Sequence, residues 1–184
     1  DNDIDFIGAK LSATTSGIFA SALSKQHKKL VELLADVLLN PDFKQEELDK
    51  LKKQTLSQLA QEKDDADAIS KNVEAVLNFG KNHPYGELTR EETLSKITLD
   101  KCNEYFKTYF RPNVAYLAVV GDVKLIDVKS LLEKHLGSWQ RADVPSFVPP
   151  MPAAPEKTRV AFVNKPGAVQ SVVTVTYPVE LKPN

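Results

Sequence analysis

Strand-like and helix-like patterns are segregated along this chain rather than alternating. Residues 10–25 alternate short apolar residues with Ser and Thr on both sides of Ser16-Gly17, which predicts a β-hairpin. Apolar residues at spacings of three and four then predict helices in succession between Leu30 and Gly80, and two more follow before Pro112. This order predicts an α+β fold, a mainly antiparallel sheet with helices on one face.

Polar residues mark where two of these helices begin. Asp64 or Asp65 is predicted to cap the helix that ends before Gly80, because a carboxylate can accept the unpaired N–H groups of a first helical turn. Thr89 with Glu92 three residues later has the pattern of a capping box. A short helix is therefore predicted to follow Thr89.

The rest of the chain is predicted to hold further strands. Val114–Val120 is a run of seven apolar residues, which is typical of a strand buried on both faces. It is far shorter than the ~20 residues of a membrane helix, so no membrane span is predicted. Residues 140–158 hold five of the eleven prolines and predict an extended linker. The chain thus divides into a domain over 1–139, this linker, and strands within 159–184.

Charge and short motifs exclude several classes of function. The 24 basic and 25 acidic residues give a net charge of −1 and are scattered, so no nucleic-acid partner is predicted. No GxGxxG or GxxxxGK[ST] sequence is present, which argues against the phosphate-binding loops of nucleotide folds. The single cysteine, Cys102, excludes an internal disulfide and is predicted to be a small core residue.

The three histidines do not form a local metal motif. His27 opens a helix among polar residues, His83 lies in a Pro-Gly turn, and His135 is near a helix end. None has a second histidine four residues away, so neither HExxH nor HxxEH occurs in the chain. Each is predicted to be an ordinary surface or turn residue rather than a zinc ligand.

Six phrases, taken in order, resemble one family: the inverzincin zinc peptidases of the pitrilysin and insulinase type, which include mitochondrial processing peptidase. The phrases are GAKLSATTSG (8–17), LVELLADVLLNPDF (30–43), EELDKLK (46–52), HPYGE (83–87), YFRPNVAYLAVVGDV (109–123) and LGSW (136–139). The resemblance implies a half-clamshell domain of antiparallel sheet and helices that encloses unfolded peptides. Residues 159–184 would then lead into, or return from, a second such domain.

The resemblance also implies that the domain lacks its first elements. In that family the HxxEH motif lies upstream of the stretch that matches residues 1–9, so it is expected outside this chain. Residues 1–9 themselves are predicted to be the end of a helix that begins upstream.

Two glutamates of the family have no counterpart here. Family members carry a zinc-binding glutamate seven residues after another functional glutamate, and the resemblance places Gln58 and Leu51 at these positions. Seven residues are two helical turns, so Leu51 and Gln58 are expected on one helix face. A neutral amide supplies no anionic ligand, which predicts a non-catalytic domain that binds no metal, with zinc only in a catalytic partner half. A one-turn shift of the alignment would instead make Glu62 the ligand.

The first strand of the predicted hairpin is a candidate peptide-binding edge. By resemblance, Ser12 and Ala13 stand where the family has an Asn-Ala pair that touches substrate, although Ser12 departs from the pattern. An extended peptide could add to such an edge through main-chain hydrogen bonds.

Three hypotheses about function follow from the sequence. The first is a structural and peptide-binding half that pairs with a catalytic zinc peptidase half or subunit. The second is an active zinc endopeptidase whose HxxEH motif lies upstream of residue 1. The third is a non-enzymatic scaffold subunit that resembles the core proteins of a respiratory complex.

Overall fold

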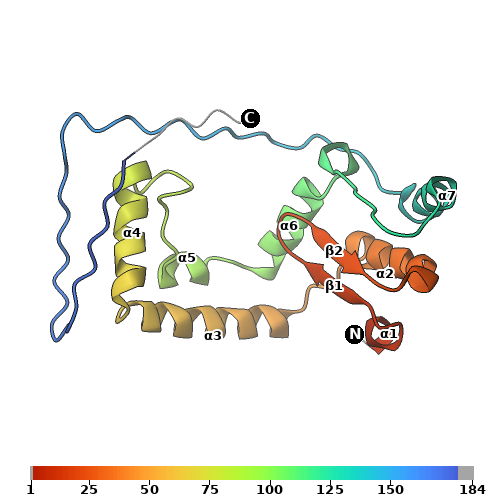
Figure 1. The fold of residues 1–184 in the computed structure, drawn as a ribbon, viewed down its shortest axis with the longest axis horizontal. Helices are drawn as coiled ribbons and strands as arrows, with labels where there is room; N and C mark the ends of the chain where they lie inside the picture. The colour runs from red at the N-terminus through yellow and green to blue at the C-terminus, as the bar shows by residue number, and fades with distance from the viewer. Residues whose placement is uncertain (1, 178–184) are drawn as a thin grey trace. The chain divides into compact units, whose positions relative to one another are not determined.

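A computed structural model describes residues 2–177, which form two compact units (Figure 1). The first unit combines the described residues up to Phe43 with Cys102–Pro145, and the second combines Lys44–Lys101 with the described residues from Ser146 onward. Residues 178–184, the end of the predicted C-terminal strand segment, lie outside the described residues. The predicted division at 140–158 stays a prediction.

The first unit contains the predicted hairpin. A short helix α1 (Asn2–Phe6) leads into β1 (Lys10–Ala13), which pairs antiparallel with β2 (Ile18–Ser21). Ser12 lies opposite Phe19 and Ala13 opposite Ile18, and the N–H of Thr14 donates to the Gly17 carbonyl at 2.8 Å. The prediction of a hairpin over 10–25 is confirmed.

Two long helices of the first unit pack on each other, and one of them also packs on the hairpin. After a 3-10 turn η1 (Ser24–Gln26), α2 (His27–Leu39) contacts both β2 and α7 (Leu125–Leu136). Ala35 of α2 and Val128 of α7 are buried. The apolar stripe that predicted α2 is therefore on the side through which it packs against α7.

Aromatic side chains join α6 (Leu99–Tyr109) to the segments beside it. The Phe106 ring meets the Phe43 ring edge-on, with centroids 5.8 Å apart, and stacks on Phe110 at 4.9 Å. The Trp139 indole N–H donates to the Phe110 carbonyl at 3.2 Å. A 3-10 turn η2 (Pro112–Val114) follows, so Pro112 ends α6 as its missing N–H requires.

The second unit is built on α3 (Gln45–Glu62) and α4 (Ala66–Phe79). The Asp65 carboxylate caps α4, since its Oδ1 accepts the N–H of Asp67 at 2.8 Å and that of Ala68 at 3.2 Å. Of the two aspartates that the sequence offered as caps, Asp65 is the one used.

Loss of this cap gives a measurable prediction. We expect Asp65→Ala to lower the free energy of unfolding by about 1 kcal/mol, because two N–H groups of the first turn lose their acceptor. Chemical denaturation of the variant measures the loss. Asp64→Ala is the matched control and is expected to change stability by less than about 0.5 kcal/mol; equal losses in the two variants would show that the cap contributes nothing.

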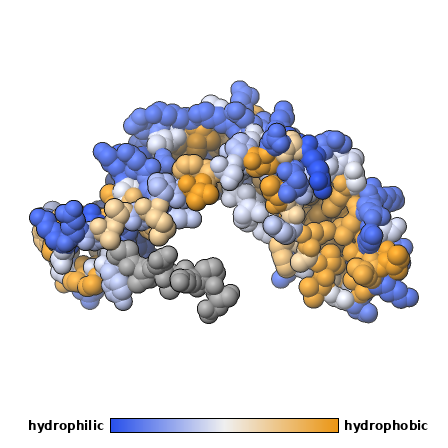
Figure 2. Space-filling model, turned by 90° about the horizontal axis from the view of Figure 1, so that it is seen from above, coloured by the Kyte–Doolittle hydropathy of each residue, from blue (hydrophilic) through white to orange (hydrophobic). Residues whose placement is uncertain are grey.

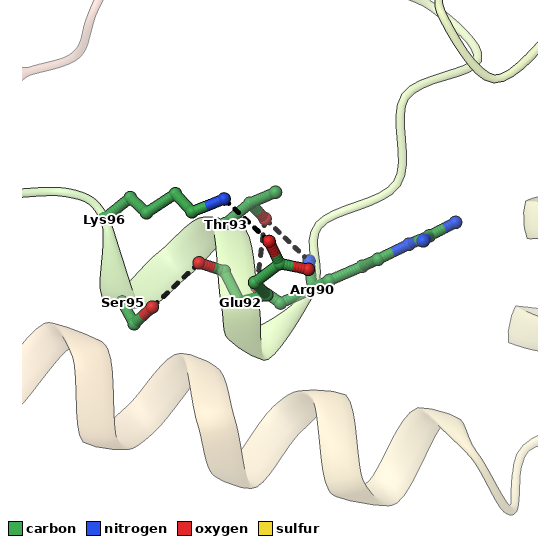
Figure 3. A network of polar contacts seen from close by, with 5 residues as sticks. All are labelled: Arg90, Glu92, Thr93, Ser95 and Lys96. Atoms are coloured by element: carbon green, nitrogen blue, oxygen red, sulfur yellow. Dashed lines mark hydrogen bonds and ion pairs between the residues drawn. The ribbon is translucent and has the colours of Figure 1, made fainter.

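The short helix α5 (Glu91–Ser95) begins one residue later than predicted, with Arg90 rather than Thr89 at its N-cap (Figure 3). Thr93 Oγ1 accepts the N–H of Arg90 at 3.0 Å and donates to the Arg90 carbonyl at 2.9 Å. Glu92 is not part of a capping box, because its carboxylate pairs with the Lys96 ammonium one turn later, at 2.7 Å. The capping box predicted from Thr89 and Glu92 is wrong.

The turn after α4 folds back onto the end of that helix. His83 is buried, its ring stacks on Phe79 with centroids 5.2 Å apart, and its Nδ1 accepts the N–H of Tyr85 at 3.1 Å. Gly86 lies so close to the Gly80 carbonyl that a Cβ on Gly86 would overlap it. The His-Pro-Tyr-Gly turn is therefore closely packed against α4.

The prediction of a mainly antiparallel sheet is not confirmed. Among residues 2–177, only β1 and β2 form a paired sheet, and helices predominate. The predicted strand over Val114–Val120 and those within 159–177 are not paired, because no described segment forms a hydrogen-bond ladder with them. Val114–Val120 was also expected to be buried, yet Tyr116 is fully exposed.

None of the helices in the described part of the chain has the length and apolar character needed to cross a membrane.

Candidate functional site

Leu51 and Gln58 lie two turns apart on α3, and both side chains are exposed. Leu51 is 58% exposed. The Gln58 amide Nε2 donates to Glu62 Oε1 at 3.0 Å. Gln58, which the sequence resemblance predicts at the position of the family's zinc-binding glutamate, is thus neutral and hydrogen-bonded to its neighbour one turn on.

This face of α3 carries little chemistry of its own. Leu51 has no donor atom, and an amide is a poor substitute for the thiolate, imidazole or carboxylate ligands that zinc prefers. From Gln54 to the end of α3 the only ionisable side chain is that of Glu62. C-terminal to Leu51, a carboxylate at this face can therefore come only from Glu62.

Glu62 lies at the rim of an apolar cavity of about 660 Å³ in the second unit. The cavity is lined mainly by aliphatic side chains of α3 and α4, and its charged lining residues besides Glu62 are Lys63, Arg90 and Glu91. No histidine or cysteine is among its lining residues. Glu62 therefore lacks, in this cavity, the imidazole and thiolate ligands that zinc prefers.

The three histidines are not gathered with these residues. His27 Nδ1 lies 2.8 Å from the Ser24 carbonyl oxygen. His83 Nδ1 accepts the N–H of Tyr85 in the turn after α4. His135 is half-buried in the last turn of α7, and Cys102 is half-buried on α6. Among residues 2–177, no group of three His, Cys, Asp or Glu side chains is placed to hold a metal ion.

The outer edge of β1 has main-chain groups available for pairing. Because Thr14 and Gly17 form a hydrogen-bonded pair, the alternation of an antiparallel ladder directs the N–H and C=O groups of Leu11 and Ala13 away from β2. No described strand pairs with this edge. Ser12 and Ala13 are both exposed. The sequence indicated β1 as a candidate edge strand. The register of the β1–β2 ladder shows that Leu11 and Ala13 supply its outward main-chain donors.

The clearest electrostatic pair is on α2 and was not anticipated from the sequence. Lys29 Nζ lies 2.9 Å from Glu32 Oε1, one turn apart. The hydrogen bond from Lys29 lowers the pKa of Glu32, and the same bond raises the pKa of Lys29. The i,i+3 spacing of opposite charges was the available signal.

Two family models match the chain in succession. Residues 1–85 match the model described as Insulinase (Peptidase family M16), and residues 96–182 match the model described as Peptidase M16 inactive domain. The chain belongs to the insulinase, or M16, family of zinc peptidases and their homologues. The resemblance to pitrilysin and insulinase-type proteins that the sequence phrases indicated is confirmed.

Relatives include both proteases and a subunit of a respiratory complex. An uncharacterized zinc protease of Bacillus subtilis is 28% identical over 142 residues, which cover 74% of this chain and 34% of the relative. Subunit 1 of the human mitochondrial cytochrome b-c1 complex is 26% identical over 159 residues, 81% of this chain and 33% of that protein. The chain thus spans about a third of the length of these curated relatives.

A solved structure shows the same fold. The crystal structure of a protease from Helicobacter pylori superposes with a TM-score of 0.64 at 20% sequence identity, over 82% of this chain and 38% of that chain. The helices with a small antiparallel sheet described above therefore belong to a protease-like fold.

Proposed function

We propose that this segment is a non-catalytic, structural and peptide-binding half that pairs with a catalytic zinc peptidase half, supplied by another subunit or by another part of the same protein. The observation that carries the proposal is the pair of uncharged side chains, Leu51 and Gln58, on the α3 face where the family has two glutamates. Residues 96–182 match a domain model described as inactive, whereas Leu51 and Gln58 lie in the part that matches the insulinase model.

The alternative ligand, Glu62, has the wrong surroundings for a zinc site. Its carboxylate already accepts a hydrogen bond from the Gln58 amide, and the cavity that it lines has Lys63, Arg90 and Glu91 as its other charged lining residues, with no histidine or cysteine. A catalytic zinc needs three protein ligands. Glu62 has no histidine pair within the described residues to complete such a set.

Peptide binding is assigned to the outer edge of β1. Leu11 and Ala13 direct their main-chain donors and acceptors outward, which is the arrangement that adds an extended peptide as a further strand. Main-chain pairing is insensitive to side-chain identity, so unfolded peptide or protein segments are the expected ligands. Ser12 directs its N–H toward β2 and takes part only through its hydroxyl.

A scaffold subunit is the second candidate function, favoured by the similarity to a cytochrome b-c1 complex subunit. A scaffold would pair with a partner subunit but would not bind extended peptides along β1. An active endopeptidase with its HxxEH motif upstream of residue 1 is the third, favoured by the relatives described as zinc proteases. Measurements of peptide binding and of chelator-sensitive cleavage distinguish these three candidate functions.

Restoring the missing carboxylate tests the non-catalytic assignment. We expect Gln58→Glu to create no peptidase activity, because one carboxylate cannot assemble a three-ligand zinc site. Cleavage of a fluorogenic peptide by the complete protein, with and without a chelator, is the measurement. Gln54→Glu, one turn away on α3, is the matched control. Chelator-sensitive cleavage that appears in Gln58→Glu and not in the control would overturn the assignment.

A further inference from the structure

Arg111 carries a buried polar atom that has no partner. Its Nε is buried, and no described residue accepts a hydrogen bond from it. None of the ion pairs within residues 2–177 includes Arg111 either. Buried polar groups are almost always hydrogen-bonded, so an exception of this kind points to a missing ion or ligand.

Local main-chain geometry positions Arg111 at the end of α6. Pro112 disfavours a helical conformation in the residue before it, and Arg111 is accordingly extended, with φ −132° and ψ 143°. Its N–H donates to the Tyr109 carbonyl oxygen at 3.1 Å, and its own carbonyl oxygen accepts the N–H of Val114 at 3.3 Å. The main chain of Arg111 is thus constrained on both sides, and its side chain lines a cavity of the first unit.

This cavity has a volume of about 340 Å³ and is mainly apolar. Arg111 is the only charged residue among those that line it, and the hairpin turn Thr15–Ile18 contributes hydroxyl groups at one side. Figure 2 shows apolar surface over the unit that contains α2 and α7. The apolar residues that line the cavity include Leu34, Leu38, Phe110, Val114, Leu136 and Trp139.

The donor and the walls of the cavity together indicate a class of ligand. A guanidinium with an unpaired Nε–H is suited to a planar anion that accepts two parallel hydrogen bonds, and a carboxylate is such an anion. A single cation offsets one negative charge, which favours a monocarboxylate over a polyphosphate. The apolar walls favour a ligand whose remaining part is aliphatic or aromatic.

The volume limits the size of this apolar part. Pockets for small molecules range from roughly 300 to 1,000 Å³, and the Arg111 cavity lies near the lower limit. The Trp139 indole N–H is already used by the Phe110 carbonyl oxygen, so Trp139 offers the ligand only its ring. A body about the size of a leucine or phenylalanine residue fits these limits.

We propose that this cavity binds a monocarboxylate with an apolar body of that size, and that the carboxylate pairs with Arg111. Such a ligand has two sources: a free acid, or the C-terminal residue of a peptide. The peptide source rests on the proposed function, because the turn Thr15–Ile18 that lines the cavity directly follows the β1 edge. The site itself does not depend on peptide binding at β1.

Two probes of equal shape test the role of the negative charge. N-acetyl-L-leucine carries a carboxylate, whereas N-acetyl-L-leucinamide carries a neutral amide in its place. In calorimetric titrations of the complete protein, we expect the acid to bind at least about tenfold more tightly than the amide. Equal affinities of the two probes, or no saturable binding of the acid, would overturn the proposal.

A peptide probe distinguishes the two sources. The pentapeptide Gly-Gly-Ser-Gly-Leu ends in the same residue with a free carboxylate. If it binds at least about tenfold more tightly than N-acetyl-L-leucine, the site takes a peptide terminus. If it binds less tightly, the site takes a free acid, and the peptide edge at β1 is unaffected.

Arg111→Met tests the residue, because it removes the guanidinium and keeps a long apolar side chain. We expect the affinity for N-acetyl-L-leucine to fall at least about tenfold and that for the amide to stay unchanged. Arg141→Met is the matched control, since Arg141 is exposed and does not line the cavity, and it is expected to change neither affinity.

The stability of the ligand-free variant separates this role from a structural one. Because the Arg111 Nε has no partner, we expect Arg111→Met to shift the melting temperature of the complete protein by less than about 2 °C. A large loss of stability, together with no binding of the acid to the unmodified protein, would show that a carboxylate of the protein itself occupies the site, and would overturn the proposal. If Arg111→Met does not fold, the comparison of acid and amide on the unmodified protein decides.

Discussion

Replacing Ala13 with proline is expected to weaken the binding of an extended peptide at least about tenfold. The register directs the Ala13 N–H away from β2, so proline removes a donor from the outer edge and leaves the ladder between β1 and β2 intact. Loss of one or two main-chain hydrogen bonds corresponds to about 1.4 kcal/mol, which is tenfold in affinity. Fluorescence anisotropy with a labelled, unstructured ten-residue peptide measures the change.

The control for this variant is the neighbouring residue. Ser12→Ala removes only a hydroxyl group and is expected to change the affinity by less than about threefold. Circular dichroism of both variants establishes that the fold is retained. If Ala13→Pro binds the peptide as tightly as the unmodified protein, β1 is not the peptide-binding edge, and the scaffold function becomes the better assignment.

Substituting alanine for Gly86 is expected to lower the free energy of unfolding by about 3 kcal/mol. A Cβ at this position would overlap the Gly80 carbonyl and lies only 3.2 Å from the Ala75 carbonyl oxygen. Both obstacles are main-chain atoms, so relief requires the turn to separate from the end of α4. The His83 ring, stacked on Phe79 and hydrogen-bonded to Tyr85, would be displaced with it. Chemical denaturation measures the loss.

Gly17→Ala is the comparison for this substitution. A Cβ added to Gly17 would meet no atom within 4 Å, and this residue lies in the hairpin turn, so we expect a change of less than about 1 kcal/mol. Hydrogen exchange of residues 76–86 should accelerate in Gly86→Ala and not in Gly17→Ala. Similar stability of the two variants would show that the turn is not tightly packed against α4.

The helices could be predicted because their signals are local. The stripe from Leu30 to Leu38 defined α2, and the Asp64-Asp65 pair marked the start of α4. The α5 cap was misassigned because Thr89 and Thr93 both offer a hydroxyl group, and the sequence does not show which of them meets a main-chain N–H. In the structure Thr93 Oγ1 accepts the Arg90 N–H, and the Glu92 carboxylate pairs with Lys96.

The sheet could not be predicted to the same extent because strand pairing is not local. The hairpin closes through a short turn, so its two strands are neighbours in the sequence. Val114–Val120 has the composition of a buried strand, but its partners are not among residues 2–177. Its apolar pattern predicted a buried strand, whereas most of its side chains are exposed among the described residues.

The sequence predicted that Leu51 and Gln58 share one face of a helix. It did not predict which side chains lie beside that face. The spacing of Leu51 and Gln58 placed them on one face, as the geometry of α3 requires. The hydrogen bond from Gln58 to Glu62 spans one turn of α3, whereas the position of Glu62 beside a mainly aliphatic cavity depends on how α3, α4 and residues 88–91 pack. These tertiary contacts have no signature in the sequence of α3 alone.

The zinc content of the complete protein and of its Glu62→Gln variant tests the central claim most directly. After equilibration with zinc and removal of the excess, elemental analysis gives the number of ions per chain. The proposed function assigns no metal ligand to α3, so we predict the same zinc content in both proteins. About one tightly held ion per chain in the unmodified protein, lost on Glu62→Gln, would contradict the account.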